Sequence, residues 1–137
     1  MRDYKKIKAN MSKVDGLNKV RNVIPVNLNE GFPHQLSKLI ACRYIRSKGY
    51  DFICEAKFKY HPGRADIYIL DLDKVIEILS SESEEMATTK SNRYPVKDIL
   101  FLRTTDDPEK LESWLDEWIV YWVIIFYSIS INWVNAL

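Results

Sequence analysis

The sequence is poor in the residues that mark several classes of protein. It holds only 2 Cys, 4 Gly, 5 Pro and 2 His in 137 residues. So few cysteines exclude a disulfide scaffold, and so little glycine and proline excludes a collagen-like repeat. It has neither a glycine-rich phosphate loop nor a serine, histidine and aspartate arrangement that would indicate a hydrolytic triad. With 47% apolar and 28% charged residues, the chain predicts one folded domain with a substantial core rather than disorder.

Excess charge of one sign is also missing, because the net charge is only +1. The charges are nevertheless unevenly distributed. Residues 1–64 hold 14 basic and 5 acidic side chains, and residues 65–137 hold 6 basic and 14 acidic ones. A basic front half suits a polyanionic partner on one side of the molecule. Residues 1–29 are polar and basic with little periodicity, which predicts a mobile or partly draped basic arm.

The cysteines and the two ends of the chain give weaker signals. Cys42 and Cys54 lack metal-ligand spacing, so we expect buried thiols in a reducing, cytoplasmic compartment. The charged first ten residues are not followed by an apolar stretch, which argues against a signal peptide. Residues 118–137 carry no charge over 20 positions, which is long enough for a membrane span. Their aromatic and β-branched content favours a buried strand or a homodimer contact, with a membrane anchor as the alternative.

Hydrophobic periodicity predicts an α/β domain over residues 30–120 and an apolar extension over 121–137. The expected elements, in order, are a helix at 30–48, strands at 51–58, 65–70 and 75–79, a helix at 80–94, a strand at 96–102 and a helix from 107 onward. The short links make the first three strands antiparallel. The helix before the fourth strand allows that strand to pair in parallel.

Two carboxylates lie in strands that are otherwise apolar. Alternation places Asp66 on one face of its strand, and an even hairpin loop brings Glu77 of the next strand diagonally onto the same face. Burying two carboxylates without a partner is costly. Mg²⁺ or Mn²⁺ would offset that cost and would activate water beside a phosphate. The alternative is that both acids lie on a solvated sheet face.

In residues 30–103 the chain resembles the PD-(D/E)xK nucleases, the restriction-endonuclease-like superfamily that includes archaeal Holliday junction resolvases and small nucleases of archaea and their viruses. The resemblance rests on the α-β-β-β-α-β-α order and on GRADIY at 63–68 followed by VIEIL at 75–79. It implies a mixed central sheet flanked by helices. It also implies that Asp66 and Glu77 bind Mg²⁺ or Mn²⁺ and are catalytic.

The same resemblance suggests further site residues. An acid on the first helix often completes such a site, and Glu30 fits, with His34 one turn later on the same face. Glu55, on the first strand, would either join the metal or pair with its neighbouring lysines. The superfamily has a lysine two residues after the second acid, but this chain has Leu79 there. Some members supply the lysine from the following helix, which makes Lys90 the leading catalytic substitute, ahead of Arg93.

Basic side chains near these acids are the candidates for nucleic-acid binding. Lys38, Arg43 and Arg46 are expected on the outer face of the first helix, either solvated or in contact with phosphates, and Arg64 belongs to the GRADIY segment. The chain is therefore expected to be a metal-dependent nuclease that hydrolyses DNA phosphodiester bonds with metal-activated water. The alternatives are a catalytically inactive nucleic-acid-binding relative, favoured by Leu79, and a membrane-anchored interaction protein, favoured only by residues 118–137.

Overall fold

The fold is built on a four-stranded mixed sheet in the order β1-β2-β3-β4. The computed structural model describes residues 2–80, 85–86, 89 and 94–119. The strands are β1 (Phe52–Ala56), β2 (Ala65–Ile69), β3 (Lys74–Leu79) and β4 (Asp98–Arg103). β1–β2 and β2–β3 pair antiparallel, whereas β3–β4 pair in parallel. This confirms the predicted α/β class and the predicted strand pairings.

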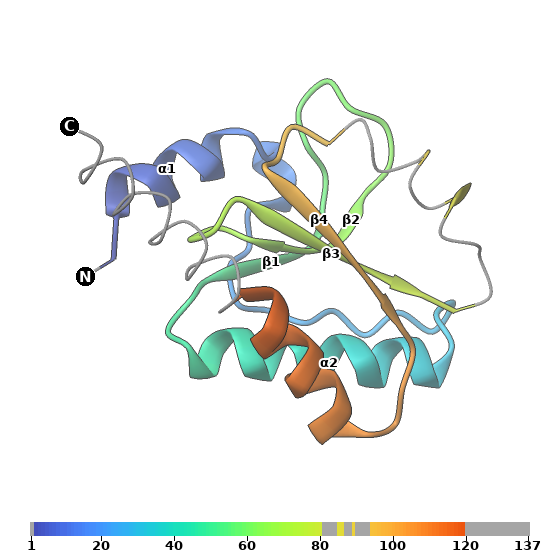
Figure 1. Cartoon of the computed structure of the whole chain (residues 1–137). Coiled ribbons are helices and arrows are strands. Elements are labelled where there is room, and N and C mark those ends of the chain that lie inside the picture. Colours follow the sequence, from blue (N-terminus) through green and yellow to red (C-terminus); the bar gives the residue numbers. More distant parts are fainter. Residues whose placement is uncertain (1, 81–84, 87–88, 90–93, 120–137) are drawn as a thin grey trace, which may run out of the picture.

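Helices cover both faces of the sheet (Figure 1). α1 (Tyr4–Ser12) and the short 3-10 turn η1 (Gly16–Asn18) precede α2 (Phe32–Ser47). A last helix spans 108–119 within the described residues. Figure 1 shows α1 on one side of the sheet, and α2 with the helix at 108–119 on the other. Most of the helix predicted at 80–94, and the extension at 121–137, lie outside the described residues.

α2 begins and ends where the sequence indicates. Pro33 occupies its first turn, where a missing backbone N–H costs nothing. Gly49 follows its end with a φ of +80°, a conformation that glycine adopts without strain. The inward face of α2 joins one apolar cluster with the sheet and the helix at 108–119, including Ile45, Ile76 and Leu115. This packing fixes α2 beneath the strands.

The N-terminal segment packs as part of the domain. Asp3 caps α1 by accepting a hydrogen bond from the Lys6 amide, 3.1 Å away. Ile7 and Val14 are buried against the second face of the sheet, and the buried Asn10 side chain donates to the Leu70 carbonyl, 2.8 Å away. Of the two predicted states, mobile or partly draped, residues 2–14 are packed against the domain and are not mobile.

Salt bridges fasten this segment to one end of the sheet, where β1 begins and where β2 turns into β3. Three aspartates there, here named the aspartate cluster, receive cations from the N-terminal segment and from α2; they are Asp51, Asp71 and Asp73. Arg2 contacts Asp51 at 2.8 Å and Asp71 at 2.9 Å. Lys13 contacts Asp73 at 2.9 Å. The predicted candidate site lies at the opposite end of these strands.

Among the described residues, no helix is long and apolar enough to cross a membrane.

Candidate metal centre

Strand register aligns three acids in a row across β1, β2 and β3. Ile67 pairs with Ile76, so the next position places Asp66 opposite Glu77. The two acids are therefore direct cross-strand neighbours, whereas the sequence had predicted a diagonal pair. On the other side of β2, the pairs Cys54↔Ile67 and Ala56↔Ala65 leave Glu55 opposite Asp66.

The pairing between β2 and β3 ends beside these acids. Its last pair is Ile67↔Ile76, and the next available amide, that of Ile78, donates instead to Asp66 Oδ2 at 2.7 Å. Glu55 has a φ of +50°, which is strained for a residue with a side chain. The strand pairing and the backbone are therefore irregular next to these acids, and such irregularity is common at functional sites.

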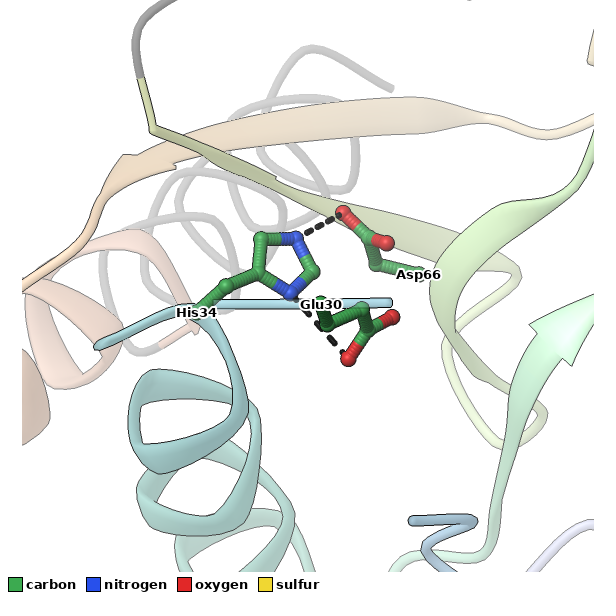
Figure 2. A group of neighbouring side chains, drawn as sticks. All are labelled: Glu30, His34 and Asp66. Carbon is green, nitrogen blue, oxygen red and sulfur yellow. Dashed lines mark ion pairs between the residues drawn. The ribbon is translucent and has the colours of Figure 1, made fainter. Parts of the chain in front are cut away.

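α2 brings a histidine to this row. His34 is half-buried in the first turn of the helix, between Glu30 and Asp66 (Figure 2). Its Nε2 lies 3.5 Å from Asp66 Oδ2, and its Nδ1 lies 3.4 Å from Glu30 Oε2. One donor atom from each of the three residues lies within 4.8 Å of the others. The expectation that Glu30 lies on the helix is wrong, because α2 begins at Phe32. Glu30 lies just before the helix and contacts His34, which in turn contacts Asp66.

Lys38 completes the arrangement, contrary to prediction. We expected it on the outer face of the helix, but its side chain is fully buried. Lys38 Nζ lies 2.8 Å from Glu30 Oε1 and 3.8 Å from Glu55 Oε1. The face of α2 that carries Lys38 points inward, and the apolar side chains of Phe32 and Leu39 are exposed instead. A buried and paired Lys38 has no route to a DNA phosphate on the outer helix face.

Glu30, His34 and Lys38 are four residues apart in the sequence, and this spacing could have indicated that Lys38 belongs with the other two. His34 and Lys38 lie on one stripe of α2, and Glu30 lies just before the helix begins. We call these three, together with Glu55, Asp66 and Glu77, the candidate site. The sequence interpretation missed Lys38 because a lysine at a helical position is usually solvated. Only the burial of the charge distinguishes it from the neighbouring Arg43, which is exposed.

Asp66 is held in its ionised form. Burial alone would raise its pKa, but the hydrogen bonds from His34 and from the Ile78 amide outweigh burial and lower it. The same contact with Asp66 raises the pKa of His34, against the effect of burial. Burial would raise the pKa of Glu30 as well, and its hydrogen bond with Lys38 lowers it instead. These groups form a compact, charged cluster.

Glu77 behaves in the opposite way. Burial, together with the charge of Asp66 beside it, raises the pKa of Glu77 to about 8. The Tyr94 hydroxyl bonds to this carboxyl group and only partly offsets the shift. Glu77 is therefore mostly protonated at neutral pH while Asp66 is charged. Two adjacent acids with divided protonation are a frequent property of catalytic sites.

Three buried polar atoms of the site have no hydrogen-bond partner: Glu30 Oε2, His34 Nδ1 and Glu77 Oε1. Glu30 Oε2 and His34 Nδ1 partly compensate each other as an ion pair at 3.4 Å, whereas an unsatisfied atom such as Glu77 Oε1 costs about 1–3 kcal/mol. All three are atoms that bind metals once deprotonated, and carboxylate oxygens suit Mg²⁺ and Mn²⁺. The donor set therefore fits a divalent cation.

Of the other predicted residues, some lie near the candidate site and others lie far from it. Arg64 is exposed, and its Nη1 lies 4.0 Å from Glu55 Oε2, at the edge of the candidate site. Arg46 is half-exposed and lies 2.8 Å from Asp51, in the aspartate cluster. Arg43 and Arg46 line a separate cavity of about 430 Å³. Leu79 is buried, while Lys90 and Arg93 lie outside the described residues.

Compared with protein-family models, with curated proteins and with solved structures, the chain shows no match. The functional argument therefore depends on the geometry of the candidate site.

Proposed function

We propose that this chain is a metal-dependent nuclease of restriction-endonuclease-like architecture that hydrolyses DNA phosphodiester bonds. One observation carries the proposal: donor atoms of Glu30, His34 and Asp66 converge within 4.8 Å, next to Glu77. This convergence supports the resemblance of the GRADIY and VIEIL segments to the PD-(D/E)xK pattern, because the two acids of that pattern are direct neighbours in the sheet.

The proposed ligands of Mg²⁺ or Mn²⁺ are carboxylates from three elements and the imidazole of His34. A bound divalent cation would stabilise charge on the phosphate and acidify a water molecule. Asp66 is the central ligand because it contacts His34 and lies opposite both Glu55 and Glu77. An imidazole donor favours Mn²⁺ over Mg²⁺. Loss of the protons on His34 and Glu77 accompanies binding.

Lys38 is the proposed replacement for the missing lysine after the second acid. Phosphodiester hydrolysis gathers negative charge on the phosphate, and a fixed cation in a water-poor site stabilises it strongly. Lys38 is fully buried and held by Glu30 at 2.8 Å. Its ammonium is already fixed in place, and it would act on the phosphate through its charge rather than by direct contact. Lys90, the substitute expected from the sequence, stays a prediction.

DNA would approach from the side of Arg64, which is exposed beside Glu55. Contacts from Arg64 and from the exposed Arg43 to phosphates would position the strand without reading its sequence. A homodimer formed through residues 121–137, and a cytoplasmic location, stay predictions because those residues lie outside the described part of the chain and location leaves no trace in the fold.

The test is incubation of the purified protein with supercoiled, linear and branched DNA, each with Mg²⁺, Mn²⁺ or EDTA. We expect cleavage with either metal, faster with Mn²⁺, and none with EDTA. Lys38→Met should lower the rate on the order of a hundredfold, while Lys48→Met, on the exposed end of α2, should leave it unchanged. DNA binding without cleavage under every metal would favour the catalytically inactive relative.

A further inference from the structure

The two cysteines of the chain lie together beside the candidate site. Cys42, on α2, and Cys54, on β1, are both free thiols, and their sulfur atoms are 3.6 Å apart. This is van der Waals contact between two residues separated by 12 positions. A disulfide needs a sulfur separation of about 2.05 Å, so the atoms must approach by about 1.5 Å.

The two thiols differ in access. Cys42 is 1% exposed, whereas Cys54 is only partly buried. Cys54 also lines a cavity of about 230 Å³, together with Glu55, Arg64 and the apolar side chains of Val20 and Val23. A molecule the size of a peroxide fits this cavity easily. An oxidant that enters it meets Cys54 first and has Cys42 directly behind.

We propose that Cys54 and Cys42 form a peroxide-sensitive thiol pair that closes to a disulfide. The Cys54 sulfur attacks one oxygen of hydrogen peroxide, the O–O bond breaks, and a sulfenic acid and one water form. The Cys42 sulfur then attacks the Cys54 sulfur, and the Cys42 proton leaves with the hydroxyl group as a second water. Two thiols are oxidised by two electrons and one peroxide is reduced to two waters.

The bond would act on the candidate site through the backbone. Lys38 lies one helical turn before Cys42, and Glu55 directly follows Cys54. Drawing the sulfurs together pulls this turn of α2 towards β1 and moves the Lys38 ammonium from Glu30 towards Glu55, which now lie 2.8 Å and 3.8 Å from it. The thiol pair therefore couples oxidation to the geometry of the charged cluster.

The experiment treats the full chain with equimolar hydrogen peroxide and follows its mass, its alkylatable thiols and its Tm. We expect a loss of about 2 Da within the monomer, no alkylatable thiol, and a rise in Tm on the order of 5–10 °C, all reversed by dithiothreitol. The largest amide NMR shifts should fall at residues 38–42 and 53–56. Cys54→Ser should leave Cys42 unoxidised, and Cys42→Ser should trap Cys54 as sulfenic or sulfinic acid.

Three results would overturn the proposal. One is a sulfinic acid on Cys54 of the unsubstituted chain while Cys42 stays alkylatable. Another is a disulfide that forms only between two chains, seen as a dimer on a non-reducing gel. The third is an internal disulfide without a rise in Tm or with shifts outside residues 38–42 and 53–56, because the native geometry would then not accommodate the bond as described.

Discussion

The two ends of the same antiparallel strands hold acidic clusters of opposite character. In the aspartate cluster, Asp51 accepts hydrogen bonds from Arg2, Arg46 and Asn22, at 2.8, 2.8 and 2.9 Å. In the candidate site, Glu30 Oε2, His34 Nδ1 and Glu77 Oε1 are buried without a hydrogen bond, and the first two face each other at 3.4 Å. Acids whose oxygens are saturated by the protein's own donors hold the fold together. Acids whose oxygens lack such donors are free to bind a ligand from outside the chain, such as a divalent cation.

The pKa values separate Glu77 of the candidate site from Asp51 of the aspartate cluster. Burial would raise the pKa of Asp51, but its hydrogen bonds with Arg2 and Asn22 lower it overall. Burial and the neighbouring Asp66 raise the pKa of Glu77 to about 8. Asp51 is therefore stabilised in its charged form, whereas Glu77 loses its proton only at alkaline pH or when a cation displaces it. The comparison predicts that substitutions at the two ends have different consequences.

The largest expected effect is the loss of cleavage in Asp66→Asn. An amide accepts less strongly from His34 and is a poor ligand for a divalent cation, so the cleavage rate should fall on the order of a thousandfold. The measurement is single-turnover cleavage of DNA with Mn²⁺. Asp51→Asn, at the other end of the strands, is the matched control and should keep its rate per folded molecule within about threefold. Equal losses in both variants would remove the distinction between the clusters.

The free energy of unfolding should depend strongly on the aspartate cluster. Asp51→Ala removes the acceptor shared by Arg2, Arg46 and Asn22, which should lower the free energy of unfolding by about 3 kcal/mol. Urea denaturation at neutral pH measures this change. Asp106→Ala, at an exposed position, should change stability by less than about 0.5 kcal/mol. An Asp51→Ala protein as stable as the parent would show that the aspartate cluster contributes nothing to the fold.

A smaller gain in stability is expected from Glu77→Gln. The folded state binds the Glu77 proton more tightly than the unfolded state, so this residue's contribution to stability declines as pH rises from about 4.5 through about 8. Glutamine keeps the shape without the charge. Relative to the parent, the variant should gain on the order of 2 kcal/mol at pH 9 and little at pH 4. Urea denaturation at both pH values checks the sign, and a loss of stability at pH 9 would contradict it.

Much of the fold followed from local patterns. α2 and the four strands were predicted because Pro33, Gly49 and short apolar runs mark their ends, and short links dictate antiparallel pairing. α1 was missed because its buried side chains, Ile7 and Asn10, are few among the lysines. Two buried side chains are too few to give a helical hydrophobic pattern in the sequence, although they are enough to pack α1 against the sheet.

The candidate site was predictable in part. Asp66 and Glu77 were identified from their place in apolar strands, and Glu30 and His34 from helical spacing. Lys38 was placed on the wrong face, because the direction of α2 depends on tertiary packing that leaves Phe32 and Leu39 exposed. The divided protonation of Asp66 and Glu77 could not be predicted from the sequence, since it arises from burial, from the hydrogen bond between His34 and Asp66, and from the Ile78 amide.

The smallest expected effect concerns DNA affinity at the rim of the candidate site. Arg64→Gln should weaken binding by about three- to tenfold and lower the salt slope by about 1, as loss of one phosphate contact does. Fluorescence anisotropy over a range of salt concentrations measures both quantities. Lys110→Gln, on the exposed face of the helix at 108–119, is the control and should change neither. An unchanged slope in Arg64→Gln would move the DNA path away from Glu55.

The most direct test of the difference between the two clusters is Mn²⁺ binding measured by isothermal titration calorimetry. The parent and Asp51→Asn should each bind Mn²⁺ at the candidate site, with an affinity that rises between pH 6 and pH 9 because His34 and Glu77 must lose protons. Asp66→Asn should lose this binding. Equal Mn²⁺ binding by Asp66→Asn and the parent, or no binding by the parent at millimolar Mn²⁺, would contradict the assignment of a metal centre to Glu30, His34 and Asp66.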